Sequence, residues 1–169
     1  MTRIAIMDDY HGVAMSLADW SGLDVTVFRD HTADPARVIE RLLPFDIICP
    51  MRERTLLSRE VIEALPNLKL IATTGMRNAA IDMAACQDRG IAVTGTSGSA
   101  TPTPELAMGL ILSLARSIPQ EGRGMRQGLW QTTVGRSLNG ATLGLLGLGK
   151  LGQQVAGYAR AFNMNLIAW

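Results

Sequence analysis

The sequence has 169 residues, enough for one ordinary domain or one and a half, with a sizeable apolar core. Hydrophobic residues make up 47% and charged residues 18%, which is the balance of a globular protein and excludes a disordered one. The formal net charge is +1 and there is no basic run or acidic tail, so we expect neither nucleic acid nor a membrane surface as a partner.

Cysteine usage and the N-terminal residues indicate a cytoplasmic protein. Cys49 and Cys86 are too few for a disulfide framework and form no CxxC pair, so we expect free thiols in a reducing compartment. Residues 1–9 carry charges where a signal peptide needs an apolar segment. The longest apolar stretch, residues 106–115, has about half the length that spans a bilayer. No metal site is predicted.

Short apolar segments alternate with amphipathic ones from the start of the chain. The apolar segments are rich in Ile and Val and predict buried strands over residues 3–8, 24–28, 46–50, 68–73 and 91–95. The amphipathic segments predict helices over residues 35–43, 58–65 and 82–89. Asp34 and Ser58 are expected as N-caps, and Gly90 is expected to end the third helix. This alternation predicts an α/β domain over residues 1–100, flavodoxin-like, with a parallel sheet covered on both faces.

A segment rich in Gly, Ser, Thr and Pro, residues 95–104, marks the boundary to a second part, residues 101–169. Thr103 is expected to cap the next helix, with Pro104 in its first position. That helix, residues 106–116, is apolar almost all round, which predicts burial between domains or between subunits.

The clearest motif is GLGKLG at residues 147–152, a GxGxxG pattern. Glycine spacing alone is weak, but a predicted strand, residues 141–146, runs directly into the motif, and a predicted helix, residues 153–162, follows it. A further strand is predicted over residues 165–169. This strand-helix-strand order predicts the start of a Rossmann dinucleotide-binding domain, and therefore NAD or NADP as the cofactor.

Each glycine of the motif has an expected role. Gly147 permits a tight turn, Gly149 lets the backbone approach a pyrophosphate, and Gly152 lets the helix pack closely. The free N–H groups around Lys150 and Leu151 are expected to face the phosphates at the positive end of the helix dipole. The alternative is a glycine-rich turn without a ligand. The residue that distinguishes NAD from NADP is expected at the end of the last strand or beyond it.

The chain as a whole resembles the D-isomer-specific 2-hydroxyacid dehydrogenases, which act on substrates such as glycerate, glyoxylate and lactate. The likeness rests on GLW at residues 128–130, on residues 138–153 around the glycine motif, on residues 161–169, and on PELAMGLILSLAR at residues 104–116. It implies an NAD(P)-dependent oxidoreductase that transfers hydride between the cofactor and a small 2-hydroxy or 2-oxo acid. It also implies a homodimer that uses the helix 104–116, and a chain that ends early in its nucleotide domain.

In this family the first domain supplies part of the substrate cleft, and the resemblance places substrate-binding residues on two loops. Arg52, in MRERT, matches an arginine that meets the substrate carboxylate. Gly75, Met76 and Arg77 match a loop whose backbone N–H groups bind that carboxylate, with Met76 and Arg77 as the donors. A guanidinium and convergent N–H donors both suit a carboxylate. Thr103 is expected to join the glycine motif in binding the cofactor.

The substrate loop departs from the family's usual pattern, Gly-x-Gly-x-Asp-Asn-Ile-Asp. This chain has Arg77 for the second glycine and Ala79 and Ala80 for Asp-Asn, while Ile81 and Asp82 are kept. The identity of the substrate is therefore left open. The loop arginines have the alternative role of solvated charges.

The family's catalytic arginine, histidine and carboxylate lie beyond the last residue of this chain, so no catalytic residue is assigned. His11 and His31 fall outside any such motif and are interpreted as surface or helix-terminal residues. We expect the chain alone to be inactive, to bind cofactor weakly or not at all, and to associate through exposed apolar faces. An alternative from another class is a non-catalytic NAD(H)-sensing interaction protein that resembles the C-terminal-binding-protein corepressors.

Overall fold

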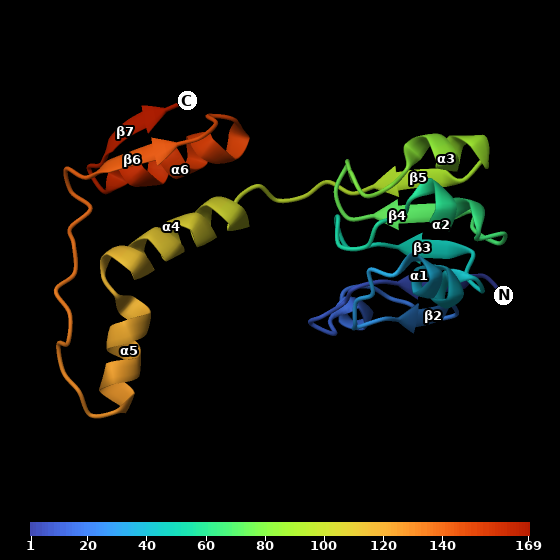
Figure 1. Ribbon diagram of the computed structural model, residues 1–169, viewed down its shortest axis with the longest axis horizontal. Helices are drawn as coiled ribbons and strands as arrows, with labels where there is room; N and C mark the ends of the chain where they lie inside the picture. The colour runs from blue at the N-terminus through green and yellow to red at the C-terminus, as the bar shows by residue number, and fades with distance from the viewer. The chain divides into compact units, whose positions relative to one another are not determined.

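The structure is a computed structural model and describes residues 1–169. The chain forms two compact units, Met1–Gly98 and Ser99–Trp169, each with strands and helices of its own (Figure 1). None of the helices combines the length and the hydropathy that crossing a bilayer demands.

The first unit is built on a five-stranded parallel sheet, as the alternation of strands and helices predicts. The strands lie in the order β2-β1-β3-β4-β5, which is the flavodoxin-like order. Each is slightly shorter than its predicted segment, because apolar residues continue into the flanking loops. The strands are β1 Arg3–Ile6, β2 Asp24–Val27, β3 Ile47–Cys49, β4 Leu70–Thr73 and β5 Ala92–Gly95.

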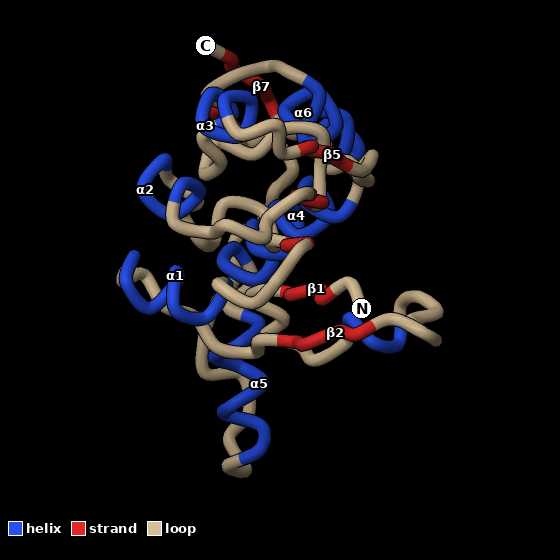
Figure 2. Tube along the Cα trace, turned by 90° about the vertical axis from the view of Figure 1, so that its right-hand side faces the viewer, coloured by secondary structure: helices blue, strands red, loops and turns tan.

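Three helices cover one face of this sheet, and in Figure 2 they lie to the left of the row of strands. Each begins after a side chain, Asp34, Ser58 or Asp82, that accepts a hydrogen bond from a first-turn N–H. Ile48 and Ile71 in the sheet are fully buried in the core that these helices close. Burial of each such side chain stabilises the folded state by roughly 2 kcal/mol. The core therefore holds the strands in place, and with them the loops that follow the strands. The helices are α1 Pro35–Leu42, α2 Arg59–Glu63 and α3 Met83–Asp88.

The opposite face of the sheet is only partly covered: Ile4 and Ile6 are buried, whereas Ile47 and Cys49 are partly exposed. Asp9 folds the start of the β1–β2 connection into a turn by accepting hydrogen bonds from two backbone N–H groups. The connection then forms only the short 3-10 helix η1, Ala14–Ser16, in place of a full crossover helix. Trp20, further along it, lines a groove of about 250 Å³ together with the partly buried Cys49 and Ala72.

The second unit holds three helices and two parallel strands, β6 and β7, which α6 connects as predicted. Helix α6 begins at Lys150, inside the glycine motif and before the predicted start at residue 153. Helix α5 is absent from the sequence-based prediction because Gly122 and Gly124 interrupt its apolar pattern. The elements are α4 Pro102–Ala115, α5 Ile118–Arg126, β6 Thr142–Leu145, α6 Lys150–Ala161 and β7 Asn165–Ala168.

Helix α4 differs from its prediction at its start and on its surface. It begins at Pro102 after Thr101, so Thr103 lies inside the first turn and the prediction that Thr103 caps the helix is wrong. Pro102 takes the first position that was expected for Pro104, because a proline fits anywhere in the first helical turn. The helix packs on α6 and buries Met108, while a stripe of leucines on its other side is exposed.

Candidate functional site

The carboxyl ends of the parallel strands bring three loops to one edge of the first unit's sheet. Arg52 follows β3, Gly75 follows β4 and Thr96 follows β5. The N–H of Gly75 donates a hydrogen bond to Oγ1 of Thr96, 3.2 Å away. A Cβ atom at Gly95 would overlap the carbonyl of Gly75, so the two backbones touch at this point. The loops after β4 and β5 therefore form one rigid backbone frame.

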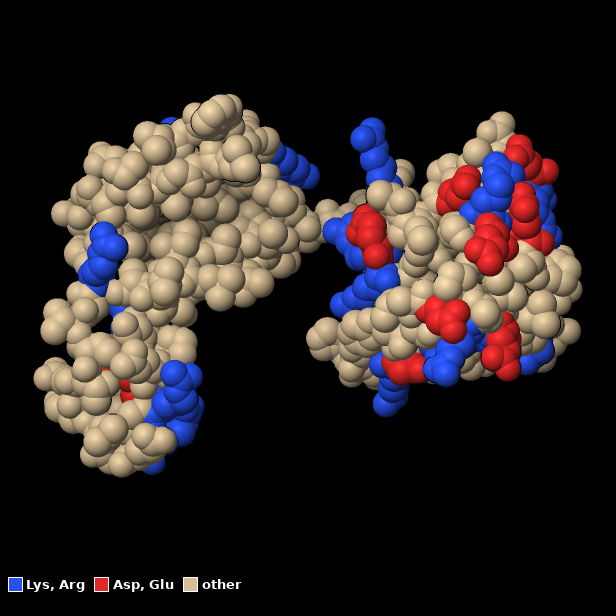
Figure 3. Space-filling model, viewed as in Figure 1, with Lys and Arg blue, Asp and Glu red and all other residues tan.

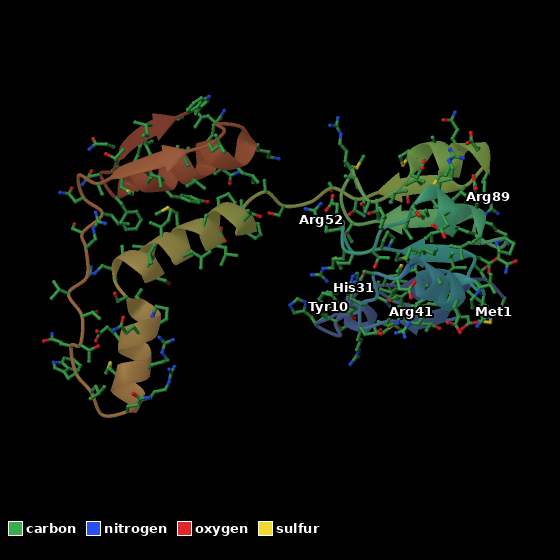
Figure 4. The ribbon with its side chains drawn as sticks, in the orientation of Figure 1. Met1, Tyr10, His31, Arg41, Arg52 and Arg89 are labelled. Carbon is green, nitrogen blue, oxygen red and sulfur yellow. The ribbon has the colours of Figure 1, made fainter.

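Arg52 reaches this frame from the loop after β3 (Figure 4). Its φ is 53°, a left-handed conformation that costs a residue with a Cβ atom on the order of 1 kcal/mol or more. Its N–H donates to Oγ1 of Thr74 at 3.2 Å, and Nη1 donates to the carbonyl of Thr74 at 3.5 Å. A Cβ atom at Gly75, whose φ is 97°, would overlap Nη1. The backbone conformation therefore favours glycine at position 75, and a larger residue there would also displace the end of the Arg52 side chain.

The predicted donors Met76 and Arg77 have the free groups that this role requires. Neither backbone N–H donates a hydrogen bond within the chain, and both side chains are exposed. A pocket of about 430 Å³ adjoins them and is also lined by Asn78 and Thr94. The structure thus brings Arg52 and two free N–H groups to the same edge of the sheet.

The charges of this unit are arranged in two ways. Away from the carboxyl ends of the strands, cations such as Arg59 and Lys69 pair with carboxylates at 2.7 to 3.0 Å, and red and blue side chains intermix over the helices in Figure 3. Arg52, Arg54 and Arg77, on the loops at the carboxyl ends, form no ion pair. Guanidinium groups without an ion-pair partner favour an anionic ligand at this edge.

A second polar cluster lies at the carboxyl ends of β1 and β2. Asp8 is 1% exposed and lies 3.0 Å from Nδ1 of His31, and it accepts a hydrogen bond from Oγ1 of Thr55 at 2.8 Å. Arg54 donates to the carbonyl of Asp8 and stacks over the ring of Tyr10. Since a carboxylate only accepts, Nδ1 of His31 is the donor. The interpretation of His31 as a simple surface residue is therefore incomplete, because its bond helps to satisfy a buried carboxylate.

The glycine motif of the second unit forms the turn between β6 and α6. Gly147 has a φ of 94°, which glycine alone adopts without strain, and its N–H donates to the carbonyl of Trp169 at 2.9 Å. A Cβ atom at Gly152 would overlap the carbonyl of Gly147, so a larger residue there would push the turn apart. At Gly149, by contrast, no heavy atom lies within 4 Å of the place that a Cβ atom would take. This side of the turn is open.

Helix α6 starts at this open side with the features of an anion site. Gly149 is its N-cap and has no side chain to cap it, so the N–H groups of the first turn, from Lys150 and Leu151 onward, are free. No acidic side chain lies in that turn, and Lys150 adds a positive charge. The open cradle and free N–H groups fit a pyrophosphate. Thr103 lies exposed in the first turn of α4, and its role as a cofactor contact stays a prediction.

Comparison with known proteins relates the chain to one family. Residues 108–169 match the family described as D-isomer specific 2-hydroxyacid dehydrogenase, NAD binding domain. The whole chain is 35% identical over 172 residues to D-3-phosphoglycerate dehydrogenase of Methanocaldococcus jannaschii, and 76% of it is 39% identical to hydroxypyruvate reductase of Thermotoga maritima. The solved structure of phosphoglycerate oxidoreductase from Vibrio cholerae O395 covers the full chain with 40% identity and a TM-score of 0.92. These similarities relate the chain, over its whole length, to the D-isomer-specific 2-hydroxyacid dehydrogenase family.

The chain spans only part of the length of these relatives. It covers 32% of the Methanocaldococcus protein, 43% of the Thermotoga protein and 56% of the Vibrio chain. The glycine motif lies within the residues that match the NAD binding domain, whereas Arg52 and Gly75 precede them. The family match and the similar proteins confirm the resemblance, and the parallel sheet together with the structural relatives confirms the fold class.

Proposed function

We propose that this chain is the substrate-binding part and the start of the cofactor-binding part of an NAD- or NADP-dependent oxidoreductase, which interconverts a small 2-hydroxy acid and its 2-oxo acid. Residues 1–100 supply the substrate domain and residues 101–169 the start of the nucleotide domain. The proposal is carried by the convergence of Arg52 and the free N–H groups of Met76 and Arg77 beside Gly75. The names of the relatives, which are dehydrogenases and reductases, favour it over the cofactor-sensing alternative.

The proposed substrate site holds the substrate carboxylate in one orientation. The guanidinium of Arg52 offers a planar pair of donors to the carboxylate, and the N–H groups of Met76 and Arg77 approach it from the neighbouring loop. Donors from two loops fix both the position and the plane of the carboxylate, so the C2 atom next to it is held in one place. Arg77 adds a positive charge where the family pattern has glycine. The loop therefore binds an anion more strongly than backbone donors alone.

The proposed cofactor site uses the turn after β6. Gly147 and Gly152 shape the turn, and the open side at Gly149 admits the pyrophosphate to the free N–H groups of Lys150 and Leu151. The nicotinamide cofactor supplies the hydride chemistry when bound. We propose Thr103 as a further contact and assign no catalytic residue within this chain.

We also propose that the complete protein is a homodimer that uses helix α4. Pro104 and Met108 on one side of the helix are buried in the second unit. On the other side Leu106, Leu110 and Leu114 form a stripe at four-residue spacing, each more than 60% exposed. An exposed stripe of this kind marks an interaction surface. Changing Leu110 to Ser is expected to lower the dimer fraction in sedimentation analysis, and an unchanged fraction contradicts the assignment.

Titration of the 169-residue chain with hydroxypyruvate tests the substrate site. Hydroxypyruvate is expected to move the amide NMR signals of Gly75, Met76 and Arg77, whereas hydroxyacetone, which lacks the carboxylate, leaves them in place. Arg52→Ala is expected to weaken binding about tenfold. Arg37→Ala, at an exposed arginine of α1, is the matched control and leaves binding unchanged. If hydroxypyruvate, glyoxylate and pyruvate all leave these signals unmoved, the carboxylate site is wrong.

A turnover assay tests the reaction itself. The protein extended to the length of its relatives is mixed with NADH or NADPH and a panel of small 2-oxo acids, and cofactor oxidation is followed by absorbance. Oxidation with at least one acid is expected. No turnover with any acid and either cofactor rejects the oxidoreductase.

A further inference from the structure

Asn78, in the loop between β4 and α3, joins two loops of the proposed carboxylate site. Its Nδ2 donates to the carbonyl of Arg52 at 2.8 Å and to Oγ1 of Thr73 at 3.0 Å. Its Oδ1 accepts from the N–H of Ala80 at 2.9 Å. One amide side chain therefore closes a turn in its own loop and holds the backbone of the loop after β3.

The residue that Asn78 holds is in a conformation that needs support. Arg52 has a φ of 53°, which is unfavourable for a residue with a Cβ atom. Its N–H is held by Oγ1 of Thr74 and its carbonyl by Nδ2 of Asn78. Both polar groups of the Arg52 backbone are thus anchored to the loop after β4, and the left-handed conformation persists because its surroundings determine it.

The backbone conformation of Arg52 decides where its guanidinium lies. With φ left-handed, the side chain turns back over the loop after β4, and Nη1 comes against Gly75 and the carbonyl of Thr74. We propose that Asn78 is a positioning residue, which keeps Arg52 left-handed and so keeps its guanidinium beside the free N–H groups of Met76 and Arg77. The part of this inference that concerns a carboxylate rests on the proposed function. The part that concerns the Arg52 backbone does not.

The sequence pattern does not assign this role to position 78. In the pattern Gly-x-Gly-x-Asp-Asn-Ile-Asp, Asn78 falls on an unspecified position. The amide of the pattern falls on Ala80, which has no polar side chain here. In this chain the side-chain amide of the loop is at Asn78, two positions before Ala80, and it donates a hydrogen bond to the carbonyl of Arg52.

The conformational part is tested by NMR on the 169-residue chain. A short intraresidue Hα–HN distance, seen as a strong NOE, reports a positive φ. This NOE at Arg52 is expected to be strong in the native chain and in Asn67→Ala, and to fall severalfold in Asn78→Ala. Asn67 is a matched control because its Nδ2 also donates to a backbone carbonyl, that of Leu43, away from the site. Asn78→Asp, which keeps the acceptor for Ala80 and loses the donor, is expected to behave like Asn78→Ala.

A strong NOE at Arg52 in Asn78→Ala or in Asn78→Asp overturns the proposal. So does a weak NOE in the native chain. These results do not depend on any ligand, and an unchanged melting temperature or native spectrum elsewhere shows that the variants are folded.

A double-mutant cycle tests the effect on binding. Asn78→Ala is expected to weaken hydroxypyruvate binding about fivefold in the native background. In the Arg52→Ala background it is expected to add no further loss, because Asn78 acts through Arg52. An equal loss in both backgrounds means that Asn78 acts elsewhere and contradicts the proposal. If the native chain binds no hydroxypyruvate, the proposed function fails, and the NOE at Arg52 still decides the role of Asn78.

Discussion

The loops at the carboxyl ends of the first sheet differ from the rest of that unit in both charge and backbone conformation. Asp8 and Arg52, the two non-glycine residues of this unit with positive φ, both lie on these loops. Arg52, Arg54 and Arg77 have no carboxylate partner there, whereas Arg59 elsewhere contacts three carboxylates. Strain and unpaired charge are thus concentrated where a ligand is expected, and the remaining surface stabilises the fold.

The largest effect is expected from Gly75→Ala, at the centre of the strained loops. The substitution places a Cβ atom on Nη1 of Arg52 at a residue with a φ of 97°, so it is expected to lower the free energy of unfolding by about 2 kcal/mol and to abolish hydroxypyruvate binding. Gly90→Ala is the control, since its φ is 66° but nothing lies within 4 Å of its Cβ position. It is expected to cost about 1 kcal/mol and to keep binding. Urea unfolding measures both, and retained binding in Gly75→Ala contradicts the site.

A smaller effect is expected from Asp8→Ala, which leaves His31 and Thr55 without their buried acceptor. The expected loss in the free energy of unfolding is about 1.5 kcal/mol. Asp24→Ala removes a carboxylate from an exposed pair with Arg3 and is expected to change stability by less than about 1 kcal/mol. Urea unfolding measures both variants. Equal losses mean that the bonds from His31 and Thr55 to Asp8 do not stabilise the loops that follow β1, β2 and β3.

The smallest effect is expected at Asp46, which lies at the amino ends of the strands, away from the loops at their carboxyl ends. The N–H of Arg3 and then the ammonium of Lys69 hold the pKa of the Asp46 carboxyl below its usual range. A carboxyl with a lowered folded pKa stabilises the fold above its unfolded pKa of about 3.9, and this stabilisation is lost as the pH falls through the folded value. Asp46→Asn is therefore expected to melt slightly lower at pH 7 and to lose less stability on acidification. Parallel melting curves for both proteins between pH 7 and pH 3 contradict this expectation.

Local features of the chain could be predicted because they depend on neighbouring residues. Asp34 and Ser58 cap helices as expected, and the turn after β6 has glycine wherever its geometry demands it. Pro102 and Pro104 both suit the first turn of α4, so the sequence pattern could not decide which of them begins the helix. For this reason Thr103 was predicted as the N-cap, although it lies in the first turn. The loops that hold Arg52 and Gly75 were indicated only by the resemblance to the family, and the parallel strands bring both loops to one edge of the sheet.

Features that depend on contacts between distant residues could not be predicted. The bond between Asp8 and His31 joins two strand ends, and the bond between Asn78 and Arg52 joins two loops. Each pair contains ordinary loop residues whose types give no sign of a partner. The left-handed conformation of Arg52 depends on the same long-range bonds, since an arginine does not adopt it by its own preference.

The contact between Gly75 and Gly95 has a consequence for how this protein can change over generations. Because the two backbones touch, substitutions at either glycine disturb the whole frame, and both positions are expected to resist change. Met76 and Arg77 project from that frame into solvent and bear none of its internal bonds. If the proposed site holds, substitutions at positions 76 and 77 are expected to alter which acid is preferred while the backbone donors keep their places, so selectivity can diverge among descendants of this chain without a new fold.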